Sequence, residues 1–124
     1  MYGISAWTVK KGWAVLSFEG SEPLTDREKC VPFLVRNGPV TIAAVPREAL
    51  RPEDNEAVME RDAMLVSVCG DELQKTGAAD GFLLRLYRNG IRVLGVSVSN
   101  IAVSVLIPSS DEALFRRIMA DIVS

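Results

Sequence analysis

The stretch from Gly90 to Ile107 constrains the fold more than any other part of the chain, because Val, Ile and Leu dominate it. Branched side chains of this kind suit a pleated, half-buried β-strand. From residue 101 onward apolar side chains alternate, which places one set on a single face of a strand: Ile101, Val103, Val105 and Ile107. The segment predicts two strands joined by a tight turn at Ser99-Asn100, because Asn tolerates a left-handed backbone. By itself such a hairpin is a core element with no chemistry of its own.

Gly95 marks a change of register within the first of these two strands. Ile91 and Val93 share one parity, whereas Val96 and Val98 share the other. A β-bulge re-aims the side chains that follow it, and glycine is common at such places. We therefore expect a bulge at Gly95.

Length and composition describe a small globular protein. The chain has 124 residues, of which 48% are hydrophobic and 24% charged, which allows one domain or two very small ones. The net charge of -2 disfavours a nucleic-acid binder, which normally carries a basic face. No apolar run approaches the length of a membrane span, and the first residues lack the pattern of a signal peptide. We expect a soluble cytoplasmic protein with neither a nucleic-acid nor a membrane partner.

The inventory of reactive side chains argues against an enzyme. The chain has no His, which removes the commonest general base and every Ser-His or Cys-His pair. Its two cysteines, Cys30 and Cys69, fit a reducing compartment and are too few for a zinc site. We expect Cys69 to be a small core residue, because it lies in an apolar strand. We predict no catalytic residue, no metal site and no cofactor.

Periodicity and turn residues predict an alternation of strands and helices along the whole chain. A hairpin connection is expected at Lys10–Gly12, and a helix is expected from the capping pattern at Thr25 and Glu28 to Asn37-Gly38. The strands expected outside the Gly90–Ile107 hairpin cover residues 4–9, 13–19, 40–45 and 64–69, and the other helices cover 53–61, 77–89 and 111–123.

The two halves of the chain contain a weak internal repeat. Ala14–Glu22 matches Met64–Glu72, and Arg36-Asn37-Gly38 matches Arg88-Asn89-Gly90 at nearly the same spacing. The second unit reads strand, helix, strand, strand, helix, which is a ferredoxin-like pattern without its fourth strand. The first unit has a spare strand, Ile4–Val9, which we expect to complete the second sheet. The prediction is an α+β chain of two ferredoxin-like βαββαβ units, 1–62 and 63–124, with antiparallel sheets and helices on one face.

Five segments carry a resemblance to a known family: Val66–Gly70, Gly77-Ala78-Ala79, Asn89-Gly90-Ile91, Ser97–Ile107 and Asp111–Val123. On these residues the second half resembles an ACT domain, specifically the C-terminal regulatory region of aspartokinases, and the first half resembles a degenerate partner unit. Thr76 stands where the family usually has Pro, Asn100 stands where it has Glu, and the kinase half is missing. The resemblance implies ACT-type units and a homodimer that binds a small amino acid, with lysine or threonine as the suggested effectors.

The resemblance also implies where an effector would bind, namely where the loop and helix start of one unit meet a strand of its partner. Backbone N–H groups at a helix N-terminus suit a carboxylate, and acidic side chains suit an ammonium group. The ligand-binding residues expected on this basis are Ser21, Glu22, Asp71, Glu72, Gly77, Ile91 and Val93. The alternative is that the acidic residues are merely solvated loop residues and the chain is a ligand-free dimerisation module.

Two other functions of a ferredoxin-like fold are disfavoured. An acylphosphatase-like enzyme needs a loop that cradles phosphate, and the acidic Gly loops of this chain would repel phosphate. An RNA-recognition sheet needs aromatic residues on its central strands for base stacking. Valines occupy those positions here: Val66, Val68, Val103 and Val105.

Overall fold

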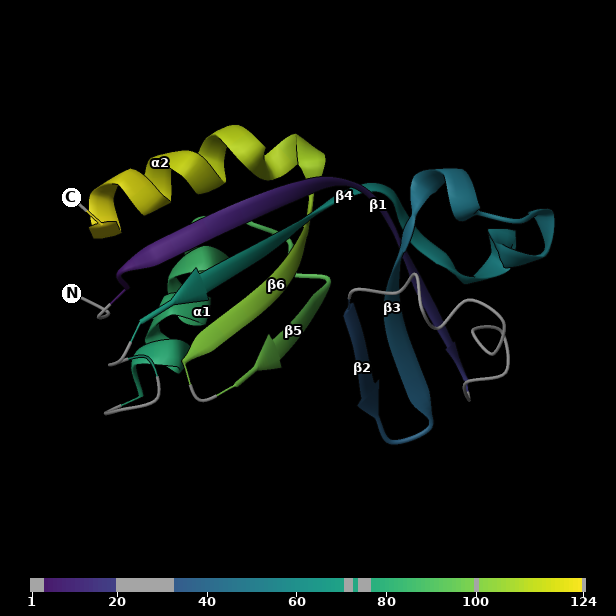
Figure 1. The fold of residues 1–124 in the computed structure, drawn as a ribbon, viewed down its shortest axis with the longest axis horizontal. Coiled ribbons are helices and arrows are strands. Elements are labelled where there is room, and N and C mark those ends of the chain that lie inside the picture. The colour runs from purple at the N-terminus through teal and green to yellow at the C-terminus, as the bar shows by residue number, and fades with distance from the viewer. Residues whose placement is uncertain (1–3, 20–32, 71–72, 74–76, 100, 124) are drawn as a thin grey trace.

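A single antiparallel sheet organises the computed structural model, which describes residues 4–19, 33–70, 73, 77–99 and 101–123 (Figure 1). Within those residues six strands follow the order β2-β3-β1-β4-β6-β5. The strands are β1 (Ala6–Glu19), β2 (Phe33–Asn37), β3 (Val40–Pro46), β4 (Val58–Cys69), β5 (Gly95–Val98) and β6 (Ala102–Pro108). The helices are α1 (Ala78–Arg88) and α2 (Glu112–Val123), with 3-10 helices η3 (Arg47–Ala49), η4 (Pro52–Ala57) and η5 (Ser109–Asp111).

Strands β1 and β4 are long and run through both halves of the sheet (Figure 1). The first part of β1, residues 6–10, pairs with residues 65–69 of β4, whereas residues 13–19 pair with β3. The predicted hairpin at Lys10–Gly12 is therefore wrong: the chain passes straight on through a β-bulge, and Gly12 takes a φ of 91° there. Residues 6–9 pair with residues 66–69 of β4, as predicted for Ile4–Val9, but they do so within one continuous six-stranded sheet rather than two separate sheets.

Both helices cover one face of the sheet formed by β1, β4, β6 and β5 (Figure 1). The core between them contains inward residues of β4 and β6 together with Phe82 and Leu86 of α1 and Phe115 and Met119 of α2. The Trp7 ring meets Phe115 edge-on, with 5.6 Å between the ring centroids. The predicted helices 77–89 and 111–123 are confirmed, and α1 ends at Arg88, two residues before Gly90, whose φ of 82° suits a helix stop.

The hairpin predicted from the organising stretch is confirmed in a shorter form. Its first strand begins at Gly95, and β5 pairs with β6 in regular register from there, so the expected bulge at Gly95 is absent. The N–H of Ser99 donates to the Ala102 carbonyl over 2.8 Å and closes the turn. Ile91 and Leu94 precede the strand and are buried. The change in alternation predicted at Gly95 arises because the residues before it do not belong to the strand. Among them, Ile91 and Leu94 pack into different core clusters.

Two helices predicted in the first half are wrong over the residues that the structure describes. Residues 33–37 form β2, and Asn37-Gly38 closes a hairpin with β3, which is a common role of Asn-Gly. The rest of that predicted helix lies outside the described residues. Residues 53–61, predicted as a charged helix, form η4 and the start of β4 instead. Val58 and Glu60 pair with Leu16 and Val15 of β1, so sheet pairing overrides local helix propensity.

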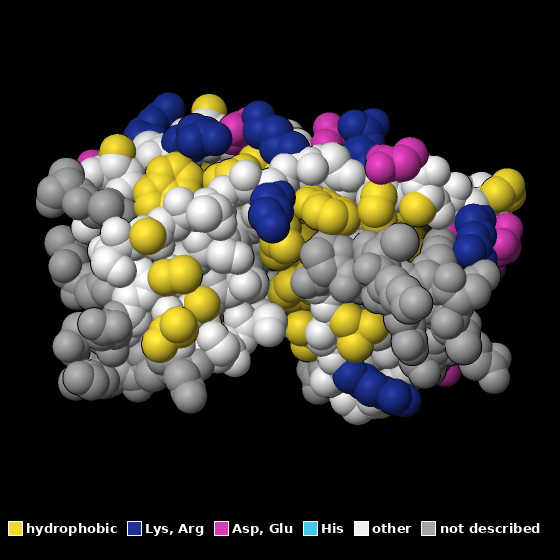
Figure 2. Space-filling model, viewed as in Figure 1, with side chains coloured by type: hydrophobic (Ala, Val, Ile, Leu, Met, Phe, Trp, Pro, Cys, Tyr) yellow, Lys and Arg dark blue, Asp and Glu magenta, His cyan; other side chains and the backbone are white. Residues whose placement is uncertain are grey.

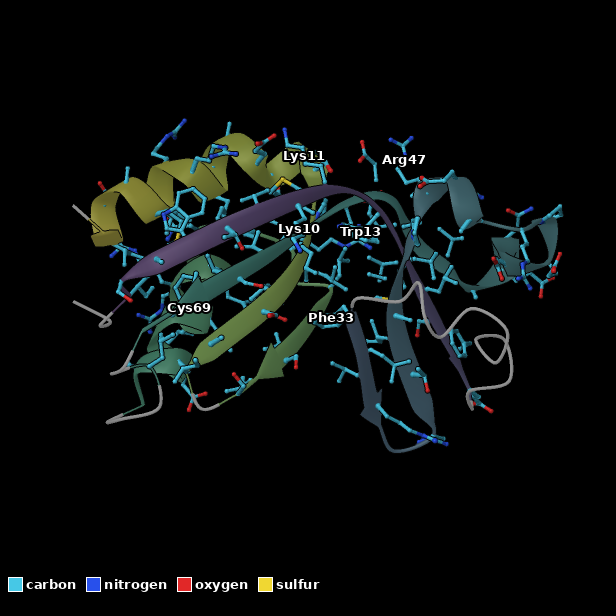
Figure 3. The ribbon with its side chains drawn as sticks, in the orientation of Figure 1. Lys10, Lys11, Trp13, Phe33, Arg47 and Cys69 are labelled. Carbon is cyan, nitrogen blue, oxygen red and sulfur yellow. The ribbon has the colours of Figure 1, made fainter. Side chains whose placement is uncertain are left out.

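The two outer strands of the sheet, β2 and β5, approach each other at one end. Phe33 of β2 lies beside β5 and is 4% exposed (Figure 3). Further down, a notch separates two lobes, one containing β2 and β3 and the other containing β5, β6 and the two α-helices (Figure 2). A β-carbon added at Gly95 would lie 3.1 Å from Cε1 of Phe33 and 3.4 Å from Cγ2 of Ile42. Phe33 belongs to a second core cluster that spans both halves and includes Val15, Leu65, Leu94 and Leu106. Gly95 therefore permits this contact between the lobes.

Replacing Gly95 by Ala is expected to destabilise the protein by about 1–3 kcal/mol, because the added methyl group overpacks the Phe33 contact. Chemical denaturation measures the change. The F33L variant opens the same contact, so the G95A/F33L double variant is expected to lose less stability than the sum of the single losses. Strict additivity of the two losses would show that the contact is not the cause.

Candidate functional site

The residues expected to bind an effector are described only in part. Ser21, Glu22, Asp71 and Glu72 lie outside the residues that the structure describes. Gly77 precedes α1, whereas Ile91 and Val93 follow it.

Gly77 provides an open helix start. It is the N-cap of α1 with a φ of 73°, it is exposed, and a β-carbon built on it would meet nothing within 4 Å. The N–H of Ala79 donates to the carbonyl of the fully buried Leu73 over 2.8 Å, which joins the first turn of α1 to a core residue. The first N–H groups of a helix lack partners within the helix and attract anions. A carboxylate is therefore the chemical group that this position suits.

Ile91 and Val93 turn their side chains toward the core. Ile91 is 2% exposed, and its N–H donates to the Leu86 carbonyl over 3.0 Å. Val93 is partly buried and packs against the same cluster. A ligand beside this segment would therefore contact mainly backbone rather than the Ile91 side chain.

One copy of the chain does not bring the two parts of this expected site together. Gly77 and Ile91 lie beyond opposite ends of α1, which runs from Ala78 to Arg88. The helix has 11 residues, which at 1.5 Å per residue is a length of about 16 Å. A small amino acid cannot bridge that distance.

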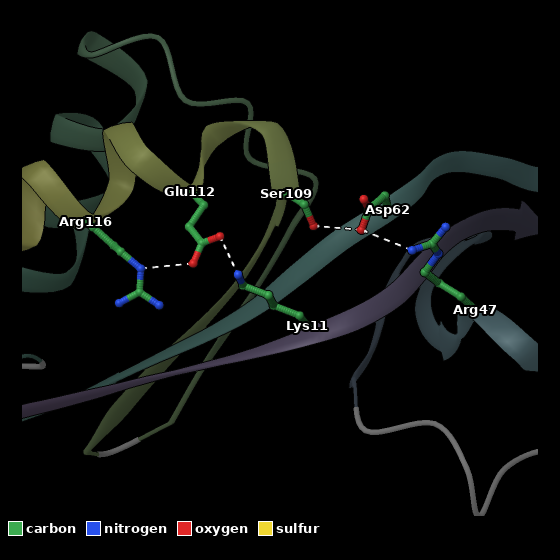
Figure 4. Close-up of polar contacts among 6 residues, drawn as sticks. All are labelled: Lys11, Arg47, Asp62, Ser109, Glu112 and Arg116. Carbon is green, nitrogen blue, oxygen red and sulfur yellow. Dashed lines mark hydrogen bonds and ion pairs between the residues drawn. The ribbon is translucent and has the colours of Figure 1, made fainter.

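A cluster of polar side chains ties α2 to the β1 bulge (Figure 4). Glu112 of α2 accepts from Lys11 Nζ over 2.6 Å and from Arg116 Nε over 3.0 Å. The hydrogen bond from Lys11, followed by that from Arg116, holds the pKa of Glu112 below its ordinary value of 4.5. Arg116 also lies over the Trp7 ring, 5.5 Å from its centroid. The bulge and the closing helix are thereby joined by charge as well as by packing.

A second group of polar contacts lies next to it, around Asp62 of β4. Asp62 Oδ1 accepts a hydrogen bond of 2.9 Å from Ser109 Oγ and faces Arg47 Nη1 at 3.8 Å (Figure 4). Charged side chains also gather along this edge of the molecule in the space-filling view (Figure 2). The edge is therefore predominantly polar.

A hollow opens on the first half of the chain, beside the cluster. It measures about 520 Å³ and is lined by Gly12, Arg47, Glu48, Leu50 and Arg61. Sequence reasoning missed it, because its residues come from separate segments and Gly12 was expected in a turn. The sequence contains one indication of it: Arg47, Glu48 and Leu50 lie in a stretch that has no strand or helix periodicity, and such irregular segments often line binding sites.

Other kinds of site find little support in the described parts of the chain. Residues 4–19, 33–70, 73, 77–99 and 101–123 contain no group of three or more acidic, Cys or His side chains placed to hold a metal. Cys69 is a free thiol at the end of β4, partly buried rather than in the core. None of the described helices has the length and apolarity needed to cross a membrane.

The E112Q substitution is expected to lower the melting temperature near neutral pH, because it removes the charge that Lys11 and Arg116 stabilise. The folded-state pKa is depressed, so this contribution is present above the unfolded value of 4.5 and is lost as pH falls through the folded pKa. Melting curves of wild type and E112Q should converge at low pH. The E19Q variant, which removes an exposed carboxylate at the end of β1, serves as the control. A difference that persists in acid would contradict the assignment.

Comparison with known proteins gives a structural answer. No family model matches the chain, and no curated protein sequence matches it. The regulatory subunit of aspartate kinase from Thermus flavus superposes with a TM-score of 0.66 at 19% identity, over 92% of this chain and 95% of that one. A structure of aspartokinase alpha and beta subunits gives 0.65 at 20% identity, over 94% and 97%.

A third structure is aspartokinase III from E. coli in complex with lysine and aspartate. It gives a TM-score of 0.63 at 11% identity, over 98% of this chain and 34% of that one. Identities this low show a shared fold. The chain therefore resembles the ACT-type regulatory region of aspartokinases, as the sequence of its second half predicts.

Proposed function

We propose that this chain is a non-catalytic regulatory module that binds a small amino acid where two copies meet. The observation that supports this most is that Gly77 and Ile91, two parts of the expected site, lie at opposite ends of α1. A second copy can place its own Ile91 next to Gly77 of the first. The fold similarity to aspartokinase regulatory subunits agrees with this role, and one such neighbour is a complex with lysine. Lysine and threonine are the first effectors to test, and the cytoplasm is the expected compartment.

The sheet supports two interleaved ferredoxin-like units. The order β1-β4-β6-β5 joins the first part of β1 to the second unit, and the order β2-β3-β1-β4 joins the start of β4 to the first unit. Each long strand then serves both units. The proposed units 1–62 and 63–124 meet inside β4, and 3-10 helices stand where the first unit would have its second helix.

The outer face of α1 has the composition of a contact surface. Leu84 and Tyr87 are 48% and 66% exposed, and Asp80 and Arg88 lie on the same side at helical spacing. Neither charged side chain forms an ion pair with the part of the chain that the structure describes. Gly81 adjoins them, although glycine in a helix interior costs about 1 kcal/mol relative to Ala. Close approach by another backbone would explain that glycine.

This face is complementary to itself. If two α1 helices pack antiparallel about a two-fold axis at Leu84, Asp80 meets the partner's Arg88 and Tyr87 covers the partner's Gly81. Such isologous contacts are the usual way in which identical chains pair. A single helix pair buries less than the roughly 800 Å² per partner of a standard interface. The expected dimer is therefore weak and depends on concentration.

The same axis completes the effector site. Gly77 and Ile91 are equally distant from Leu84 along the chain, so Gly77 of one copy lies level with the partner's Ile91. The helix start would then bind the effector carboxylate, and backbone groups near residues 91–93 of the other copy would line the seam. Asp71 and Glu72, which precede Gly77 in sequence, are the proposed partners of the ammonium group, and Ser21 and Glu22 are proposed for the equivalent loop of the first unit.

The D80R variant is expected to weaken the dimer by at least about tenfold, because it sets like charges opposite each other twice across the axis. The R88D variant should do the same. The double variant D80R/R88D restores opposite charges and should recover most of the dimer. Sedimentation over a range of concentrations measures this, with R36D on β2 as the charge control. The idea fails if the double variant is as monomeric as the single variants.

Free amino acids are expected to raise the melting temperature of the wild type. An effector at one hundred times its dissociation constant adds about 2.7 kcal/mol of stability. D80R should lose this shift and D80R/R88D should regain it, because the site needs both copies. If a dimer forms but none of the standard amino acids shifts its melting temperature, the chain is a ligand-free dimerisation module, which the self-complementary α1 face also supports.

A further inference from the structure

The hollow beside the β1 bulge is not used by the proposed effector seam. It is open to solvent on one side, and its volume of about 520 Å³ is within the roughly 300–1,000 Å³ range of small-molecule sites, so a small ligand has room there. Gly12 of β1, Arg47 and Glu48 of η3, Leu50, and Arg61 of β4 surround it. It therefore combines two cations, one anion and one apolar side chain.

The β1 bulge contributes Gly12 to the lining of the hollow. Lys10 pairs with Leu65 and Trp13 with Ala63, so Lys11 and Gly12 together stand opposite Met64 alone. A β-carbon built on Gly12 would meet nothing within 4 Å. The backbone at Gly12 is therefore accessible to a ligand.

Both guanidinium groups keep hydrogen-bonding capacity. Arg47 faces Asp62 at 3.8 Å, too far for a hydrogen bond, and Asp62 Oδ1 already accepts from Ser109. Arg61 donates from Nη2 to Asn55 Oδ1 over 3.1 Å. Each guanidinium carries five N–H donors, and their planar arrangement matches a carboxylate. The two arginines can thus bind an anionic group without losing their present contacts.

We propose that this hollow binds a small zwitterion with an apolar body. Its carboxylate would bind Arg47 and Arg61, its ammonium group would bind Glu48, and its hydrocarbon part would pack on Leu50. Both signs of charge on one lining favour a ligand that carries both, because Glu48 would repel a phosphate ion bound between the arginines. The inference is independent of the effector seam, since the hollow is complete within one copy.

L-leucine is the probe for this hollow, and the amide signals of the isotope-labelled protein report where it binds. The Gly12 amide and the Arg47 and Arg61 Nε signals are expected to shift saturably with L-leucine. Acetate and inorganic phosphate, which lack an ammonium group, should bind at least about tenfold more weakly. Equal shifts with all three probes would overturn the zwitterion claim, and no shift at Gly12 would overturn the site.

Variants separate the two ends of the ligand. R47Q/R61Q is expected to abolish the Gly12 shift, whereas E48Q should weaken L-leucine binding and leave acetate binding unchanged or stronger. R36Q/R117Q removes two exposed arginines elsewhere and should change nothing. Amide dispersion confirms that each variant is folded. Shifts at Gly77 and Ile91 report the effector seam separately, so a failure there leaves the result at Gly12 intact.

Discussion

The pairing of β1 with β4 is the constraint on which the rest of this structure depends. These two strands form the centre of the sheet, and each contributes one end to each half of the molecule. Sheets of this length accumulate twist, and irregularities in register relieve it. The register between them shifts near Lys10, Trp13 and Val15. The bulge at Gly12 thus allows β1 to stay paired with β4 in both lobes.

Packing of the two lobes follows from this shared centre. On one side, α1 and α2 cover the sheet and bury a core built from alternate residues of β4 and β6. On the other, the twisted sheet brings the outer strands together at Phe33 and Gly95, and the cluster that includes Leu65, Leu94 and Leu106 fills the junction. Polar contacts of Lys11 and Asp62 with η5 and α2 brace the bulge from outside. The lobes are therefore joined by the β1–β4 pairing, by a shared hydrophobic cluster and by polar side-chain contacts.

The two proposed binding places differ in what they require. The proposed seam at Gly77 would need a second copy, because Gly77 and Ile91 lie at opposite ends of α1, so ligand binding there would be coupled to assembly. By linkage, an effector that binds the dimer alone shifts the equilibrium toward the dimer. The hollow at Gly12 needs no partner, yet it lies on the bulge that joins the lobes. A regulatory module with both places could respond through assembly and through the junction of its two halves.

The sequence by itself determined the second half of the chain, because the residues there carry strong and consistent local signals. The alternation from Ile101 to Ile107, the amphipathic spacing of α1 and α2, and the Asn89-Gly90 stop each predict the element that forms. The resemblance to aspartokinase regulatory regions rests on the same residues. The pairing of residues 6–9 with β4 could be predicted because the strand pattern of the second half was one strand short.

Tertiary structure alone decided the middle of the chain. The residues from Pro52 to Arg61 have a helical composition, but β1 offers an unpaired edge to which the end of this stretch hydrogen-bonds as the start of β4. Asn37-Gly38 closes a hairpin where the same letters at Asn89-Gly90 end a helix, because a left-handed glycine suits either role. Lys10–Gly12 looked like a turn and became a bulge, since both flanking segments pair with β4. The hollow of Gly12, Arg47 and Arg61 exists only through that long-range pairing, which no local pattern encodes.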